Sequence, residues 1–124
     1  MTADSFLLEI PAVAVYLGTA RSFSSQIAQQ AGFDEATVED VKLAVSEACA
    51  GSVGPPGSDG RVVVRSWLEP RIVAFEVEGT GDFAPDGSQD APARIDLIKT
   101  LFPDASLARH NGRTTVRFTI PLRG

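Results

Sequence analysis

Cysteine and histidine are almost missing from this chain of 124 residues, since each occurs once. The lone Cys49 has no partner for an internal disulfide, which indicates a reducing compartment. No group of histidine and cysteine residues has the spacing of a zinc site. The lone His110 precedes Asn111 and Gly112 in an expected hairpin tip, where the buried, oriented histidine of a Ser-His-Asp triad is rarely found. The sequence therefore favours neither a disulfide scaffold, a zinc enzyme nor a triad hydrolase.

Long apolar runs and basic clusters are also lacking. No stretch approaches the roughly 20 apolar residues that a membrane helix needs, and the start, MTADSFLLEI, has no basic region ahead of an apolar one, as a signal peptide would. The net charge is −5, the isoelectric point is near 4.7, and the basic residues are scattered, so the basic footprint of a nucleic-acid binder is missing. We therefore expect a cytoplasmic protein that contacts neither a membrane nor nucleic acid directly.

The chain does have enough apolar sequence for one core, because its length and its apolar fraction of 44% predict a single domain over residues 1–124. Hydrophobic spacing, caps and turn residues predict, in order, a strand Ser5–Ile10, helices Ala12–Ala31 and Glu35–Gly51, strands Arg61–Leu68 and Arg71–Glu78, a helix Pro92–Phe102, and strands Ala105–Arg109 and Thr114–Leu122. Asp34 is the expected N-cap of the second helix, and Asn111-Gly112 is the expected turn of the last hairpin. This order predicts an α+β fold, a two-layer sandwich with a mostly antiparallel sheet and its helices on one face.

Glu47 is the residue that points most directly to chemistry. It lies on the predicted helix Glu35–Gly51, opposite Val38, yet its neighbours on that side, such as Leu43 and Ala44, are apolar. A carboxylate is costly in such surroundings unless it is paired or functional. Two interpretations stay open from the residues alone. Glu47 is either a general base or orienter of a metal-bound water, or it is a carboxylate at a crevice edge that is solvated or paired to an arginine.

A glycine-rich stretch, Glu78-Gly-Thr-Gly-Asp-Phe83, follows the second expected hairpin strand. Glycine lets a backbone approach a nucleotide closely, because it adds no side chain. The stretch is not a Walker A loop, which needs Gly-Lys-Ser/Thr, and it is not a dinucleotide fingerprint, which needs a βαβ unit. Taken alone, it is better explained as an ordinary surface turn.

The segment Val41-Lys-Leu-Ala-Val-Ser-Glu-Ala-Cys-Ala50 resembles the N-box helix of the RsbW-type anti-sigma factors, which are serine/threonine protein kinases of the GHKL (histidine-kinase-like) ATPase superfamily. In that family the motif reads approximately Leu-Ala-Val-x-Glu-Ala-x-x-Asn. The preceding Ala20-Arg21-Ser22-Phe23, the link Gly32-Phe33-Asp34 and the ending Asn111–Leu122 are also similar to the family. The resemblance covers nearly the whole chain and implies the two-layer fold of the histidine-kinase-like ATPases.

The resemblance also implies roles for particular residues. Glu47 matches the catalytic glutamate that activates the attacking hydroxyl or water, while Gly51 stands where the family has its Mg²⁺-ligating asparagine. The family's second nucleotide motif reads approximately Asp-x-Gly-x-Gly-Phe. When its phenylalanine is aligned with Phe83, Glu78 falls at the position of the aspartate that binds the adenine amine. The degenerate nucleotide-binding set implied in this way is Gly51, Glu78, Gly79, Thr80, Gly81 and, from the lid region, Arg94.

ATP and Mg²⁺ are the cofactors that the resemblance implies, but every matched nucleotide contact except Glu47 is altered. We expect an anti-sigma-factor-type regulator, a homodimer that binds a sigma factor or an STAS-domain anti-sigma factor antagonist, with ATP binding weakened or lost. An acidic surface suits a basic partner. The alternatives are an active serine/threonine kinase that phosphorylates such an antagonist, and a structural relic that serves only for dimerisation or scaffolding.

Overall fold

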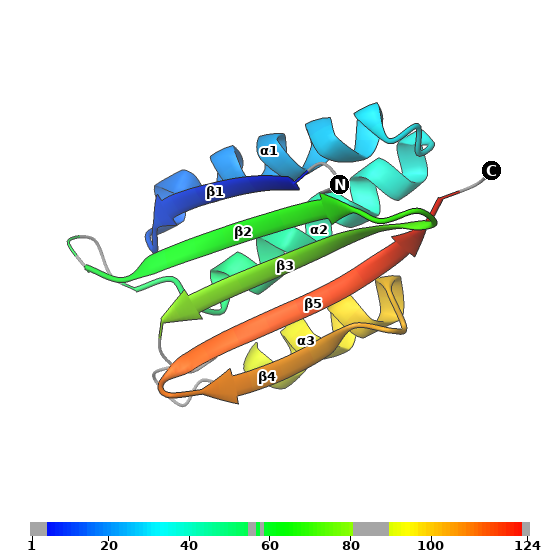
Figure 1. Ribbon diagram of the computed structural model, residues 1–124. Helices are drawn as coiled ribbons and strands as arrows, with labels where there is room; N and C mark the ends of the chain where they lie inside the picture. Colours follow the sequence, from blue (N-terminus) through cyan, green and yellow to red (C-terminus); the bar gives the residue numbers. More distant parts are fainter. Residues whose placement is uncertain (1–4, 55–56, 58, 81–89, 123–124) are drawn as a thin grey trace.

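The computed structural model describes residues 5–54, 57, 59–80 and 90–122 (Figure 1). Its elements in chain order are β1 (Ser5–Pro11), the short 3₁₀ helix η1 (Ala14–Tyr16), α1 (Leu17–Gln30), α2 (Glu35–Ala50), β2 (Arg61–Leu68), β3 (Ile72–Thr80), α3 (Asp90–Leu101), β4 (Ser106–His110) and β5 (Arg113–Pro121). No helix within this described part is long and apolar enough to cross a membrane.

The strands form one five-stranded antiparallel sheet in the order β1-β2-β3-β5-β4. Figure 1 shows α1, α2 and α3 together on one face of this sheet, with α2 behind its centre. The expected α+β two-layer sandwich is therefore confirmed. Among the described residues, helices cover one face of the sheet and none lies on the other; the two are called below the helix face and the open face.

Alternation along the strands decides which side chains enter the core. In β2, Val62 and Val64 are buried against the helices, whereas Val63 and Arg65 lie on the open face. The core between the layers is built around aromatic rings, since Phe118 stacks on Phe75 and on Phe102 with centroid distances of 5.4 and 4.4 Å. Burial of each such ring contributes about 2–3 kcal/mol, so this stack anchors β3, β5 and the end of α3 to one another.

Helix α2 is the central element of the helix layer. The carboxylate of Asp34 accepts a hydrogen bond from the Thr37 backbone N–H at 2.9 Å, which confirms the predicted N-cap. Six of its residues are buried, namely Val38, Val41, Ala44, Val45, Ala48 and Cys49. Leu43, by contrast, is 41% exposed. The helix is therefore buried along one face, and its opposite side is partly or fully exposed to solvent.

The first predicted helix began too early. Ala12 lies outside the helix, because its N–H donates to the Gly60 carbonyl and its carbonyl accepts from the Gly54 N–H, both at 2.9 Å. A residue whose two backbone groups pair with a loop cannot also join a helix. Regular α-helix starts only at Leu17, after η1.

The predicted strand Arg61–Leu68 is confirmed, and the remaining elements differ from their predicted bounds by one or two residues at one end or both. Helix α3 begins at Asp90, so Pro92 lies in its first turn, where a missing N–H costs no helical bond. The predicted final turn is confirmed, since Asn111 and Gly112 have φ values of 52° and 75°, as a two-residue hairpin turn requires.

Candidate functional site

Glu47 lies in the last turns of α2 and faces α3. Its Oε2 is 3.1 Å from Nη1 of Arg94, and the two side chains are 27% and 28% exposed. The pairing to an arginine that one of the two interpretations expects is present, and the role of Glu47 as a general base stays a prediction. The contact engages one oxygen of the carboxylate, Oε2, and joins the end of α2 to α3.

The neighbouring residues on α2 hold the helix against its surroundings. The hydroxyl of Ser46 accepts a hydrogen bond of 2.8 Å from Nη1 of Arg21, which ties α1 to α2 one residue before Glu47. Cys49 is fully buried, and burial raises the pKa of its thiol to about 12. A thiol in that state is not a nucleophile at neutral pH, so Cys49 is core packing.

Gly51 caps the C-terminus of α2. It is buried, its N–H donates to the Glu47 carbonyl at 3.2 Å, and its φ and ψ of −63° and −18° are ordinary helical values. The backbone therefore does not require glycine here. Without a side chain, Gly51 offers no ligand to a cation, and no group of three or more acidic, histidine or cysteine side chains could hold a metal among the residues that the structure describes.

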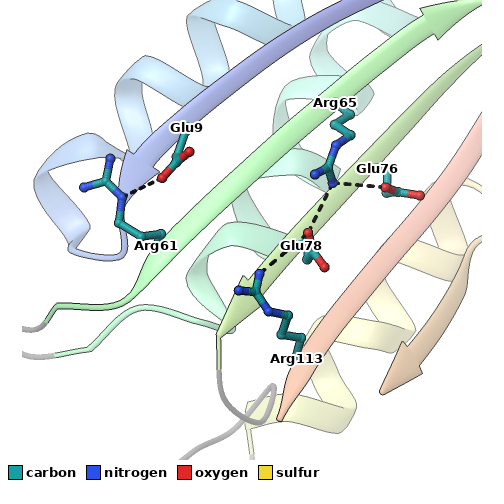
Figure 2. A network of polar contacts seen from close by, with 6 residues as sticks. All are labelled: Glu9, Arg61, Arg65, Glu76, Glu78 and Arg113. Carbon is teal, nitrogen blue, oxygen red and sulfur yellow. Dashed lines mark hydrogen bonds and ion pairs between the residues drawn. The ribbon is translucent and has the colours of Figure 1, made fainter. Parts of the chain in front are cut away.

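Glu78 lies on the open face, away from Glu47. Its Oε1 is 3.2 Å from Nη1 of Arg65 and 3.9 Å from Nη1 of Arg113 (Figure 2). Arg65 is shared with Glu76, whose Oε1 is 3.4 Å away. The structure therefore does not bring Glu78 together with Glu47, because a sheet separates their side chains.

Gly79 is the residue at this end of β3 that faces the helices. A Cβ built on Gly79 would collide with Oγ of Ser52 and lie 2.5 Å from its Cβ, and such approaches are not tolerated between non-bonded atoms. Ser52 is 8% exposed and directly follows Gly51. Ser52 is thus a residue of the candidate site that the motif comparison overlooked, although strand alternation from Val77 could have shown that Gly79 faces inward.

The other predicted site residues fall in three places. Thr80 is the last residue of β3 and pairs with Arg113 in the sheet. Gly81 lies outside the described residues. Arg94, on α3, is the residue of the implied nucleotide set whose side chain contacts the Glu47 carboxylate in the described structure.

The open face is strongly charged but balanced in sign. Besides the contacts of Glu78, it carries an ion pair of 3.0 Å between Glu9 and Arg61 (Figure 2). The guanidinium of Arg117 lies 5.1 Å from the centre of the Trp67 ring, a cation–π contact. The ion pairs are partly exposed to solvent, so each contributes little to the stability of the fold.

Two of the side-chain ligands that the family resemblance implies for ATP and Mg²⁺ are missing from the described helix face. Gly51 has no side-chain ligand for the cation. Glu78, the residue matched to the base-binding aspartate, lies on the open face, and the helix face at this end of β3 carries Gly79 instead. The carboxylate of Glu47 is already paired. No step through the nucleotide can be derived from these residues.

Comparison with known proteins gives a consistent family. Residues 10–120 match the family described as the histidine kinase-like ATPase domain. Serine-protein kinase RsbW of Bacillus pumilus (strain SAFR-032) is 36% identical over a stretch that covers 66% of this chain and 54% of that protein. Serine-protein kinase RsbW of Listeria monocytogenes (serovar 1/2a) is 44% identical, with 91% of this chain and 85% of that protein covered.

A solved structure supports the same fold. The crystal structure of the RsbU and RsbW domains of Rv1364c from Mycobacterium tuberculosis matches with a TM-score of 0.76 and 19% sequence identity, covering 98% of this chain and 33% of that one. At this identity the likeness shows the fold alone. The family match and the RsbW relatives show more: this chain belongs to the histidine kinase-like ATPase family, within its RsbW-type branch.

Proposed function

We propose that this protein is an anti-sigma-factor-type regulator that acts by binding a protein partner, either a sigma factor or an STAS-domain anti-sigma factor antagonist, with ATP binding weakened or lost. The observation that carries the proposal is the ion pair of 3.1 Å between Glu47 and Arg94. This ion pair engages Glu47, the one residue that matches the family's catalytic glutamate. The two-layer fold, which would present the surface for a protein partner, is intact. Gly51 supports the same conclusion, because it removes a ligand for the cation that phosphoryl transfer needs.

Charge supports a basic protein as the partner. The chain carries a net charge of −5, and acidic surfaces steer basic partners towards a complex. Sigma factors are basic where they face DNA, so a regulator of this charge suits them. The proposal also includes a homodimer, in keeping with the family resemblance.

The first experiment measures partner binding without nucleotide. The purified protein is titrated with each sigma factor and each STAS-domain protein of its own source organism, with and without ATP and Mg²⁺, in a calorimeter. We expect one partner to bind with micromolar or tighter affinity and with the same affinity in both conditions. Absence of binding to every member of the set, or binding that requires ATP, would contradict the proposal.

An active serine/threonine kinase is the second candidate, and the 27% exposure of the Glu47 side chain favours it, because solvent and a substrate hydroxyl can still reach the carboxylate. The helical backbone of Gly51 permits asparagine. If the scaffold is otherwise competent, Gly51→Asn raises phosphate transfer to an STAS-domain antagonist that binds. Gly18→Asn is the matched control, because Gly18 lies on α1 with no atom near its Cβ position. No transfer by the wild type or by Gly51→Asn would remove this candidate.

The open face is the surface that we propose for the homodimer. Leu7 is 61% exposed there, opposite Arg65 in the sheet register, and Trp67 lies on the same strand as Arg65. Tryptophan and arginine are the residues most enriched at interface centres. Leu7→Asp should therefore lower the molar mass measured by sedimentation equilibrium, whereas Leu43→Asp, an exposed leucine of α2 in the helix layer, should not. Equal masses for wild type and Leu7→Asp would contradict this surface.

A further inference from the structure

Two residues far apart in the chain, Ser52 and Gly79, compete for one position in space. Along the end of β3, Val77 enters the core, Glu78 lies on the open face, and Gly79 is again turned to the helices. Gly79 is therefore the position from which a side chain would enter the layer between the end of the sheet and the end of α2.

The hydroxymethyl group of Ser52 fills that position. A Cβ at Gly79 would overlap Oγ of Ser52 and lie 2.5 Å from its Cβ, but it would lie 3.8 Å from Cγ2 of Val62, which is an ordinary contact. Ser52 is the obstacle among the atoms nearest to this Cβ position. Its backbone is held in place, because its N–H donates to the Cys49 carbonyl at 3.0 Å, and the residue is buried.

This position lies at the end of α2 that also carries Glu47 and Gly51. Ser52 follows Gly51 directly, and the inward orientation of Gly79 changes the register of the second nucleotide motif. Counted from the residue that faces the helices, the motif reads Gly79-Thr80-Gly81, with glycine where the family aspartate is expected, and Glu78 falls on the open face. The cation position at Gly51 and the base position at Gly79 are thus both altered, and Ser52, which contacts the second, directly follows the first in the chain.

We propose that Ser52 and Gly79 form an interlocking pair that fills the base-binding end of the crevice, so that the chain excludes adenine by its own packing. The pair excludes the adenine base, and it does so independently of the missing cation ligand at Gly51. Protein interiors are close-packed, so a side chain at 79 and the Ser52 side chain are mutually exclusive. This inference rests on the proposed function only in assuming that the crevice between α2 and β3 is the family's nucleotide site.

The first test is a set of substitutions read by thermal unfolding. Gly79→Ala should lower the melting temperature by about 5–10 °C, as overpacking of a core does. Ser52→Ala combined with Gly79→Ala should give no rescue, because Cβ of residue 52 would still lie 2.5 Å from the new Cβ. Ser52→Gly combined with Gly79→Ala should restore most of the loss. An equal effect of Gly79→Ala in the wild type and in the Ser52→Gly variant would overturn the interlock.

The second test measures whether adenosine binds in the space that Ser52→Gly opens next to residue 79. The double variant Ser52→Gly, Gly79→Asp and its control Ser52→Gly, Gly79→Ala are titrated with adenosine, which tests the base alone and does not depend on magnesium. We expect the aspartate variant to bind adenosine at least about tenfold more tightly than the alanine control, with no such gain for guanosine, by NMR shifts of α2 and β3 amides. If the aspartate variant does not fold, Ser52→Gly, Gly79→Asn supplies a neutral acceptor for the same comparison.

Equal adenosine affinity in the carboxylate or amide variant and the alanine control would overturn the assignment of this space to the base. Wild type that binds adenosine as tightly as the double variant would overturn it as well. Failure of the proposed function has a different signature, because partner binding is measured on wild type without nucleotide. The interlock can therefore fail while partner binding persists, and the reverse also holds.

Discussion

The carboxylate of Glu47 and the guanidinium of Arg94 lie 3.1 Å apart and join the end of α2 to α3. Each side chain is a little more than one quarter exposed, so water and salt weaken the attraction between them. The pair links the residue that most resembles a catalytic base to the helix that follows residues 81–89. It should therefore influence the chemistry of Glu47 more than the stability of the fold.

The energetic part of that statement can be measured with a double-mutant cycle. We expect Glu47→Gln and Arg94→Gln each to lower the free energy of unfolding by less than about 1 kcal/mol, with a coupling of about 0.5 kcal/mol in urea denaturation. The exposed pair Glu39–Lys42, 3.0 Å apart on α2, is a control with a smaller expected coupling of about 0.3 kcal/mol. A coupling above about 2 kcal/mol for Glu47–Arg94 would show that the pair behaves as buried.

Cys49 predicts a loss of stability at alkaline pH. Burial raises the pKa of its thiol from 9.0 to about 12, so between these values the unfolded thiol is ionised while the folded one keeps its proton. Unfolding then releases a proton, and the free energy of unfolding falls as pH rises from 9 to 12, by up to about 1.4 kcal/mol per pH unit. Cys49→Ala should flatten this dependence in urea titrations at several pH values. An identical slope in the variant would exclude Cys49 as the cause.

Two glycines predict opposite effects of the same substitution. Gly18 lies on α1 with no atom within 4 Å of its Cβ position, so Gly18→Ala should raise the free energy of unfolding by about 0.5 kcal/mol. Gly112 has a φ of 75° in the β4–β5 turn, so Gly112→Ala should lower it by about 1 kcal/mol. Both values come from chemical denaturation of the full chain. A destabilised Gly18→Ala would mean that this face of α1 has a contact partner in solution.

The N-cap of α2 gives a fourth prediction. Asp34→Ala removes the acceptor for the Thr37 N–H and should cost about 1 kcal/mol, whereas Asp34→Asn keeps an acceptor and should cost only a few tenths. Thermal unfolding of the two variants in parallel separates the hydrogen bond from the charge. Equal losses would assign the effect to the negative charge at the helix N-terminus.

Much of the fold follows from local signals. Asp34 and the apolar spacing set the start of α2, and Asn111-Gly112 sets the last turn, because each depends on chemistry within a few residues. The start of α1 could not be found in this way. Ala12 pairs with Gly54 and Gly60, more than forty residues away, and such pairing overrides a helical apolar pattern.

The candidate site was predictable only in part. Glu47 stands out because a carboxylate on a mostly apolar helix is unusual, but its arginine partner comes from a helix 47 residues later in the chain. Anchoring the motif on Phe83 matched Glu78 to the family aspartate, whereas the alternation of β3 puts the Glu78 side chain on the open face, away from Glu47. Ser52 could be recognised only once the end of α2 and the end of β3 were placed side by side.

The geometry of Ser52 and Gly79 also constrains how this sequence could change over generations. A side chain at 79 is tolerated only after residue 52 has become glycine, since even the Cβ of residue 52 lies 2.5 Å from the position in question. Substitution in the other order passes through an overpacked and less stable protein. A residue with a side chain can thus return at 79 without overpacking only if residue 52 changes first. The combination of Ser52 and Gly79 is therefore hard to reverse by single substitutions.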